Sequence, residues 1–209
     1  MNKWLVSISI AAAFAASPVY ASVKNFEGFS AGVTINHAGS LFKVQRSYTS
    51  DYASRTEHSS SQDYGMSPGL QLQYRFPLGE TFVLGVGGSF DSENSVDLKG
   101  LYGQSVKLKD TSSLFLSPGY AVGERWLVYA KLAGVNANLA SGASTSEMKG
   151  TGFGAGFQYA LADNWYLQAE FMTHHYREMQ HSDSSGRLQR LSKAGFQSDV
   201  LTLGIGYRF

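Results

Sequence analysis

The sequence predicts an all-β fold: an eight-stranded antiparallel up-and-down transmembrane β-barrel. Apolar residues alternate with small or polar ones in eight segments, and alternating side chains lie on the two opposite faces of a β-strand. The chain contains 23 glycines, 13 phenylalanines and 12 tyrosines but 4 prolines, which suits strands with aromatic faces better than helices. Short turns and long polar connections also alternate along the chain, which is typical of a membrane barrel.

The first 21 residues have the pattern of a cleaved secretory signal. Lys3 precedes the apolar run WLVSISIAAAFAA, and Val19-Tyr20-Ala21 has the small-x-small pattern of a cleavage site. Because the apolar run is too short for a membrane-spanning helix, we expect cleavage after Ala21 rather than a membrane anchor. The predicted organisation is a signal peptide at residues 1–21 and one barrel domain at residues 22–209.

The predicted mature chain has balanced charge and no cysteine. The full chain has 17 Lys and Arg against 16 Asp and Glu, so loss of Lys3 leaves 16 of each. This balance gives no reason to expect a nucleic acid as partner. Without cysteine there is neither a disulfide framework nor a lipid-modified residue at the new N-terminus.

Each of the eight expected strands has one apolar face. They cover residues 28–37, 67–76, 82–91, 114–122, 126–136, 152–161, 165–171 and 201–209. In the segment 126–136 we place Trp126, Val128, Ala130 and Leu132 outside because this frame turns Lys131 inward, and Gly134 then also faces outward. Outward aromatic residues near the strand ends predict an interfacial girdle: Phe76, Phe82, Trp126, Trp165, Tyr207 and Phe209.

The connections fall into two classes. Residues 77–80, 123–125 and 162–164 are rich in turn formers, whereas the segments 38–66, 92–110, 138–150 and 177–197 are long and polar. We expect the long segments to be loops at one end of the barrel. A sheet in hydrocarbon must close on itself, since lipid offers no partners to an open edge, and the interior of a narrow barrel must be filled by side chains.

The end of the chain, GIGYRF, resembles the small outer-membrane barrels of Gram-negative bacteria, the OmpA/OmpX/Ail and opacity-antigen class. The stretches SLFLSPGYAVGERWLVYAKLAGV (113–135) and GFGAGFQYALADNWYLQAEF (152–171) are similar to strands of that class. The resemblance implies an outer-membrane location and a C-terminal assembly signal, Tyr207 and Phe209, that the barrel-assembly machinery reads. The class includes adhesins and purely structural barrels, so the resemblance alone does not choose a ligand.

The candidate site inside the barrel is an ion pair. Lys131 and Glu170 each lie five residues after the first residue of their expected strands, which predicts equal heights inside the lumen. Because buried charges need partners, we interpret the pair as a permanent plug; a gate that opens a pore is the alternative. We expect Arg75 and Arg208 lower, facing the periplasmic mouth.

Other candidate residues lie near the outer end. Arg187, Arg190 and Lys193 give the segment 177–197 a mild positive excess and are candidate contacts to lipopolysaccharide phosphates or a host ligand. His174 and His175 lie near the rim, where a lipid hydrolase would need a nucleophile beside its base. No His-x-Ser motif is present there, so we interpret both histidines as solvent-exposed rim residues.

The sequence therefore predicts a non-enzymatic outer-membrane surface protein, either structural or adhesin-like. The expected partners are outer-membrane lipids and lipopolysaccharide, the barrel-assembly machinery and a host surface ligand. We expect no cofactor and no metal; the glycine-rich stretch GTGFGAG (150–156) has a period of two and lines the lumen in this interpretation, rather than forming a nucleotide-binding loop. A lipid-A-modifying hydrolase and a narrow pore are the alternative functions.

Overall fold

A computed structural model describes residues 23–49, 54–92, 97–99, 105–141, 144–161, 164–177, 179–185 and 188–209. The predicted signal peptide lies outside the described residues. The elements are η1 (Val23–Asn25), β1 (Gly28–Thr49), β2 (Ser54–Leu78), β3 (Phe82–Asp91), β4 (Asp97–Lys99), β5 (Ser105–Val122), β6 (Trp126–Ser141), β7 (Ser144–Ala160), β8 (Trp165–Tyr176), β9 (Met179–Ser185) and β10 (Leu188–Arg208). Within the described ranges no helix is long and apolar enough to cross a membrane.

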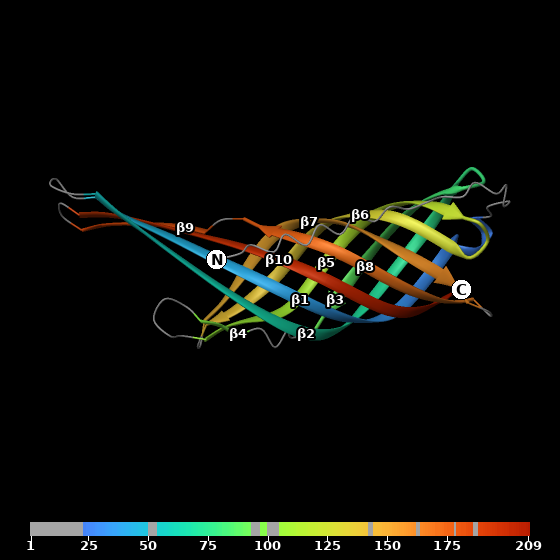
Figure 1. The fold of residues 1–209 in the computed structure, drawn as a ribbon, viewed down its shortest axis with the longest axis horizontal. Helices are drawn as coiled ribbons and strands as arrows, with labels where there is room; N and C mark the ends of the chain where they lie inside the picture. The colour runs from blue at the N-terminus through green and yellow to red at the C-terminus, as the bar shows by residue number, and fades with distance from the viewer. Residues whose placement is uncertain are drawn as a thin grey trace, which may run out of the picture.

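Eight of these strands form a closed antiparallel barrel (Figure 1). Their order around the barrel is β1-β2-β3-β5-β6-β7-β8-β10, and β10 pairs with β1 to complete the circle, for example through Val33 opposite Ile205. The short strands β4 and β9 pair with β5 and β10 outside this circle. Closure leaves the barrel without an open edge, and the prediction of an eight-stranded up-and-down barrel is confirmed.

The two faces of each strand have opposite character. On β6 the outward Leu132 is 58% exposed, whereas the inward neighbour Lys131 is 5% exposed. Tyr129 also faces inward and is buried, while Trp126 is exposed. The frame predicted for segment 126–136 is therefore confirmed, and a wall with an apolar exterior and a partly polar interior is the arrangement of a barrel in lipid.

One end of the barrel, which we call the turn end, carries the short connections and the aromatic belt. Gly79 (φ 85°) and Gly123 (φ 68°) have the left-handed backbone that tight turns require and that glycine adopts without strain. Outward aromatic rings contact one another here, as in Phe82 with Tyr120 (centroids 5.0 Å apart) and Trp165 with Tyr207 (5.3 Å). The predicted girdle residues are outward or rim residues in the structure, at this end of the barrel.

The opposite end, the hairpin end, differs from the sequence prediction. Most of the segments expected as loops at 38–66, 92–110, 138–150 and 177–197 are strands: β1 pairs with β2 as far as Thr49 opposite Ser54, and β6 with β7 as far as Ser141 opposite Ser144. The loop prediction was wrong because the apolar residues of these strands, such as Leu41, Phe42 and Val44 of β1, do not alternate regularly with polar ones. Their backbone groups are nonetheless paired across the hairpin.

Four of these extended segments form one projecting sheet. We call it the outer arm: residues 40–49 of β1, 54–63 of β2, 188–197 of β10, and β9. Its strands are hydrogen-bonded in the order β2-β1-β10-β9. Figure 1 shows these strands running together beyond the rest of the barrel. The outer arm therefore belongs to the same continuous sheet as the barrel wall.

Candidate functional site in the barrel lumen

The lumen contains three tiers, which can be followed along the inward face of β6. From the turn end these inward residues are Leu127, Tyr129, Lys131, Ala133, Val135 and Ala137. Leu127 and Tyr129 belong to an apolar cluster at the turn end, and Ala133 to Ala137 belong to a second one towards the hairpin end. Lys131 lies between them, so the only charged residue on this face sits between two apolar layers.

The lower apolar cluster includes residues from the first described segment, which precedes β1. It comprises Val23, Phe26, Val83, Ala121, Leu127, Tyr129 and Ala160. Phe26 is 3% exposed, and the Val23 amide donates a hydrogen bond of 3.3 Å to the Glu80 carbonyl oxygen in the β2–β3 turn. The Asn25 side chain donates to the Glu124 carbonyl oxygen in the β5–β6 turn, 2.8 Å away. The segment 23–26 is thus fastened to two turns and closes the mouth at the turn end.

The middle tier is a polar cluster that we call the lumen network: Gln71, Arg75, Tyr129, Lys131, Gln158, Gln168 and Glu170. Lys131 Nζ lies 2.7 Å from Glu170 Oε2. The second carboxylate oxygen, Glu170 Oε1, accepts a hydrogen bond of 2.6 Å from the Tyr129 hydroxyl. Lys131 also donates to Gln71 Oε1 (3.1 Å) and lies 4.0 Å from the centroid of the Phe115 ring. Each charge of the pair therefore has a second partner.

Arg75 is part of this network, contrary to the prediction that it faces the periplasmic mouth. Its side chain is buried, its Nη1 donates to Gln158 Oε1 at 2.6 Å, and its guanidinium lies 5.7 Å from the Tyr129 ring centroid. The reason is that segment 23–26 lies between this level and the mouth at the turn end. Arg208, by contrast, is half-buried at the rim, where it donates to Asn164 Oδ1 at 3.1 Å.

Above the ion pair is a small polar cavity of about 30 Å³. Asn36 links its walls, because its amide nitrogen donates to Asp91 Oδ1 (2.7 Å) and its Oδ1 accepts from Thr202 (2.7 Å). A cavity of this size has room for about one or two water molecules. The upper apolar cluster then follows: Phe115, Ala133, Val135, Ala137, Met148, Met172, Tyr176 and Phe196.

The two rim histidines face opposite sides of the wall, which corrects the prediction for one of them. His175 is exposed and its ring stacks on Phe153 (centroids 5.7 Å apart). His174 instead lines the polar cavity and is only partly exposed, because alternate residues of β8 point inward. None of the side-chain hydrogen bonds among the described residues involves His174; its ring makes an edge contact with Tyr176.

Glycines on the inward face give the large rings of the lumen their space. A Cβ atom on Gly156 would lie 2.7 Å from the Tyr129 hydroxyl oxygen, and one on Gly206 would overlap the Tyr166 ring. One on Gly154 would lie 2.7 Å from the Met172 sulfur. The stretch GTGFGAG therefore places its glycines against lumen side chains, and its prediction as lumen lining is confirmed.

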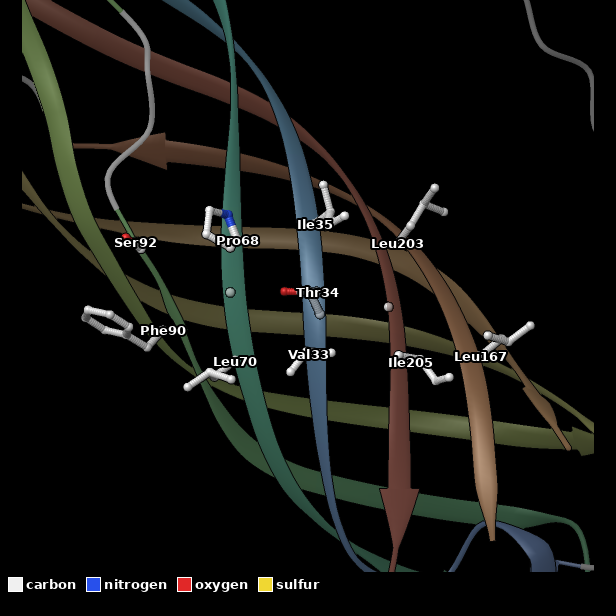
Figure 2. Close-up of a pocket in the computed structure, with 12 residues that line it drawn as sticks. Val33, Thr34, Ile35, Pro68, Leu70, Phe90, Ser92, Leu167, Leu203 and Ile205 are labelled. Carbon is white, nitrogen blue, oxygen red and sulfur yellow. The ribbon is translucent and has the colours of Figure 1, made fainter. Parts of the chain in front are cut away.

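A large hollow lies on the outside of the wall. Figure 2 shows side chains from β1, β2, β3, β8 and β10 around it, among them Val33, Leu70, Phe90 and Ile205. Its volume is about 680 Å³, and none of its lining residues is ionisable. Because the large apolar side chains around it are exposed, this hollow faces lipid and offers no group for acid–base chemistry.

The remaining predicted site residues lie far from the lumen network in the fold. Tyr207 and Phe209 are at the turn end, with ring centroids 5.2 Å apart, and the Phe209 amide donates to the Phe29 carbonyl oxygen at 2.9 Å. Arg190 and Lys193 lie on β10 in the outer arm, opposite Asp183 and Gln180 of β9. Arg187 lies outside the described residues. The candidate sites are thus at three separate levels.

The sequence pattern predicted neither the closure of the turn end by segment 23–26 nor most of the lumen network. Gln71, Gln158 and Gln168 occupy inward positions that a period of two identifies, but their contacts depend on how far neighbouring strands are staggered. Val23 and Phe26 precede the first alternating segment. Two apolar residues three positions apart are too short a pattern to predict a plug.

Comparison with known proteins identifies the family. Residues 7–209 match the family described as "Outer membrane protein beta-barrel domain". The chain belongs to this family. It is located in the outer membrane, as the resemblance of its C-terminal strand implied. Comparison with curated protein sequences finds no significant match.

Several solved outer-membrane barrels are similar to this chain, and the likeness of fold rests on OprG. OprG from Pseudomonas aeruginosa is 15% identical with a TM-score of 0.53, and the match covers 88% of this chain and 98% of OprG. Ail, the attachment invasion locus protein of Yersinia pestis, is 18% identical with a TM-score of 0.44 over 88% of this chain and 99% of Ail. The protease OmpT from Escherichia coli is 8% identical with a TM-score of 0.43 over 87% and 97%. At these identities the likeness concerns the fold alone.

Proposed function

We propose that this protein is a non-enzymatic surface protein of the outer membrane that holds the outer arm outside the bilayer for contact with a ligand. The observation that carries this proposal is strand length. Strands β1, β2 and β10 have 22, 25 and 21 residues, whereas their neighbours β3 and β8 have 10 and 12. A strand crosses a bilayer with roughly 9–11 residues, so the three longest strands continue well beyond the hydrocarbon.

The direction of the arm supports an extracellular ligand. Membrane barrels of this kind have short periplasmic turns and long extracellular connections, which assigns the turn end to the periplasm and the outer arm to the cell exterior. Arg187, Arg190 and Lys193 lie in or beside this arm by sequence. We assign them to contacts with an anionic host ligand, because arginine and lysine form charge-assisted hydrogen bonds with sulfate, phosphate or carboxylate groups.

The filled lumen supports this function over a pore. Apolar clusters lie on both sides of the Lys131–Glu170 pair, and each charge of the pair has further partners. A path for ions would have to break these contacts and part both clusters. We therefore assign the pair a structural role, as a plug that stabilises the barrel.

The surroundings of His174 support the same function over hydrolysis. A base that activates a nucleophile is hydrogen-bonded to it, and no such bond joins His174 to a hydroxyl group among the described residues. For assembly, we assign Tyr207 and Phe209 to recognition by the barrel-assembly machinery. Phe209 is exposed and Tyr207 half-buried at the end of β10, next to the seam with β1, which suits such a contact.

Shortening the outer arm tests the proposed function. Gln45 pairs with His58 across the β1–β2 hairpin, so removal of residues 46–57 shortens both strands equally and preserves the register. We expect the shortened protein to reach the cell surface in normal amount and, like the full barrel, to shift on gels after boiling. Binding of bacteria to host cells or matrix should fall, because the arm loses the end of the β1–β2 hairpin, including Tyr48, the β1 partner of Arg190.

A hairpin on the opposite side is the matched control. Removal of residues 140–145 shortens β6 and β7 but leaves the outer arm complete; Leu139 and Ser146 then form a two-residue turn between Asn138 and Glu147, which are already paired. This variant should bind as the full protein does. Unchanged binding after removal of 46–57, at equal surface levels, contradicts the ligand-binding role and leaves a structural barrel.

A further inference from the structure

Two cationic side chains lie side by side on the outward face of the wall near the hairpin end. Lys149 and Arg177 are both exposed, and the Arg177 amide donates a 3.0 Å hydrogen bond to the Lys149 carbonyl oxygen. Glu147 reaches Lys149 at 3.7 Å, but more than half of each side chain is exposed, and such pairs are weak. Among the described residues no carboxylate pairs with Arg177.

These cations stand where the apolar exterior ends. The next outward pair below them is Thr151 opposite His175, and below that pair is Phe153, whose ring stacks on His175. Phe153 is 54% exposed. By the orientation of the barrel, this height is the boundary between the acyl chains and the headgroups of the outer leaflet.

A hollow in the lipid-facing wall begins at the same level. It has a volume of about 520 Å³ and extends across β3, β5, β6 and β7, with Val86, Leu114, Leu116 and Leu132 in its lining. Gly134 creates much of this space, since a Cβ atom built on it has no neighbour within 4 Å. Gly134 pairs with Thr151, and the next outward residue of β6, Asn136, pairs with Lys149. The β7 edge of the hollow, at Thr151, therefore lies one outward position below Lys149, and Arg177 lies beside Lys149.

We propose that Lys149, Arg177 and this hollow form a binding site for an acylated, phosphorylated glycolipid of the outer leaflet, the lipid A part of lipopolysaccharide. The two cations bind its phosphate group, and one of its acyl chains occupies the hollow next to Gly134. Phosphate is a strong acceptor for arginine and lysine, and an apolar chain fits a lining without ionisable groups. The site lies on the barrel wall and does not depend on the outer arm.

The hollow of Figure 2 is an internal comparison. It is larger, and above it the outward residues of β1 and β2 are His37, Met66 and Tyr64. His37 and Tyr64 stack on each other, with centroids 6.0 Å apart. Between Pro68 and Tyr64, and between Ile35 and His37, there is no lysine or arginine. The hollow next to Gly134 is therefore distinguished by the cations above it rather than by its size.

The test is lipid retention by the purified, folded barrel, measured by native mass spectrometry with bisphosphorylated lipid A as the probe. The double variant Lys149→Gln with Arg177→Gln should retain it about tenfold less well. Lys24→Gln, an exposed cation of the segment at the turn end, is the charge-matched control and should match the unmodified protein. Equal retention by the double variant and this control overturns the cationic part of the site.

Filling the hollow tests the acyl-chain part separately. Gly134→Leu should lower retention of lipid A, whereas Ala130→Leu, on the same face of β6 and outside the hollow, should not. Phosphatidylglycerol as a second probe should be retained less than lipid A by the unmodified protein; equal retention shows a general site for anionic lipids and overturns the glycolipid assignment. The gel shift after boiling verifies the fold of every variant, and failure of the outer-arm experiment leaves these results unaffected.

Discussion

The inward and outward faces of β6 differ in what they require of a residue. Lys131 on the inward face is held by Glu170, by Gln71 and by the Phe115 ring. Its outward neighbour Leu132 is 58% exposed to the surroundings. The inward residue needs particular partners at particular distances, whereas the outward residue needs only to be apolar. The interior of this barrel therefore requires particular residues, whereas the exterior requires only residues that lipid can surround.

The largest loss of stability is expected when a buried inward residue loses its partner. Lys131→Met leaves Glu170 buried without its countercharge, and we expect a loss of about 3–5 kcal/mol in the free energy of unfolding. Urea unfolding in detergent or lipid vesicles measures this loss. The double variant Lys131→Met with Glu170→Gln should recover much of it, because the uncompensated charge is gone. Losses that simply add would mean that the two side chains are not coupled.

A charge on the outward face should lower the free energy of unfolding somewhat less than Lys131→Met does. Leu132→Arg places a guanidinium in the hydrocarbon, and we expect a loss of about 2–4 kcal/mol in the same unfolding measurement. Leu132→Met keeps the face apolar and should change stability by less than about 1 kcal/mol. A large loss of unfolding free energy for Leu132→Met would contradict the tolerant exterior. It would mean that the outward face, like the inward one, requires particular residues.

The segment 23–26 packs against inward strand residues at the turn end, although it is not itself part of a strand. Phe26 is buried in the lower apolar cluster, and Phe26→Ala should lower the free energy of unfolding by about 2–3 kcal/mol. This is less than the usual cost in a closed core, because the segment can move into water. Phe26→Leu should retain most of the stability. If both variants unfold like the unmodified protein, the segment does not pack in the mouth.

The strands of the barrel wall could be predicted from the sequence better than the contacts in the lumen or the outer arm. Strands with one apolar face, such as residues 126–136, were identified correctly because lipid imposes a strict alternation. The outer arm was not, since its strands lack a continuous apolar face and pair through their backbones. Lys131 and Glu170 were assigned one height from their positions in their strands, and the structure joins them at 2.7 Å.

Arg75 shows why the rest of the lumen was harder to predict. Its inward direction follows from the alternation in β2, but its burial depends on segment 23–26, which lies below it and carries no alternation of its own. Its contact with Gln158 joins β2 to β7, which are not neighbours in the barrel. Contacts across a lumen depend on the stagger between neighbouring strands. The alternation of residues within each strand does not predict this stagger.

The most direct test of the two-face account is a scan of β6 with nitroxide spin labels. The chain contains no cysteine, so single cysteine variants at Val128, Ala130, Leu132, Ala133 and Ala137 each carry one label. In lipid vesicles the first three, which face outward, should be relaxed strongly by oxygen, which concentrates in hydrocarbon. Labels at Ala133 and Ala137 should be immobile and poorly relaxed by both oxygen and a water-soluble nickel complex. Strong relaxation of these two by the nickel complex, equal to that of a label at the exposed turn residue Glu124, would show a water-filled lumen and contradict the account.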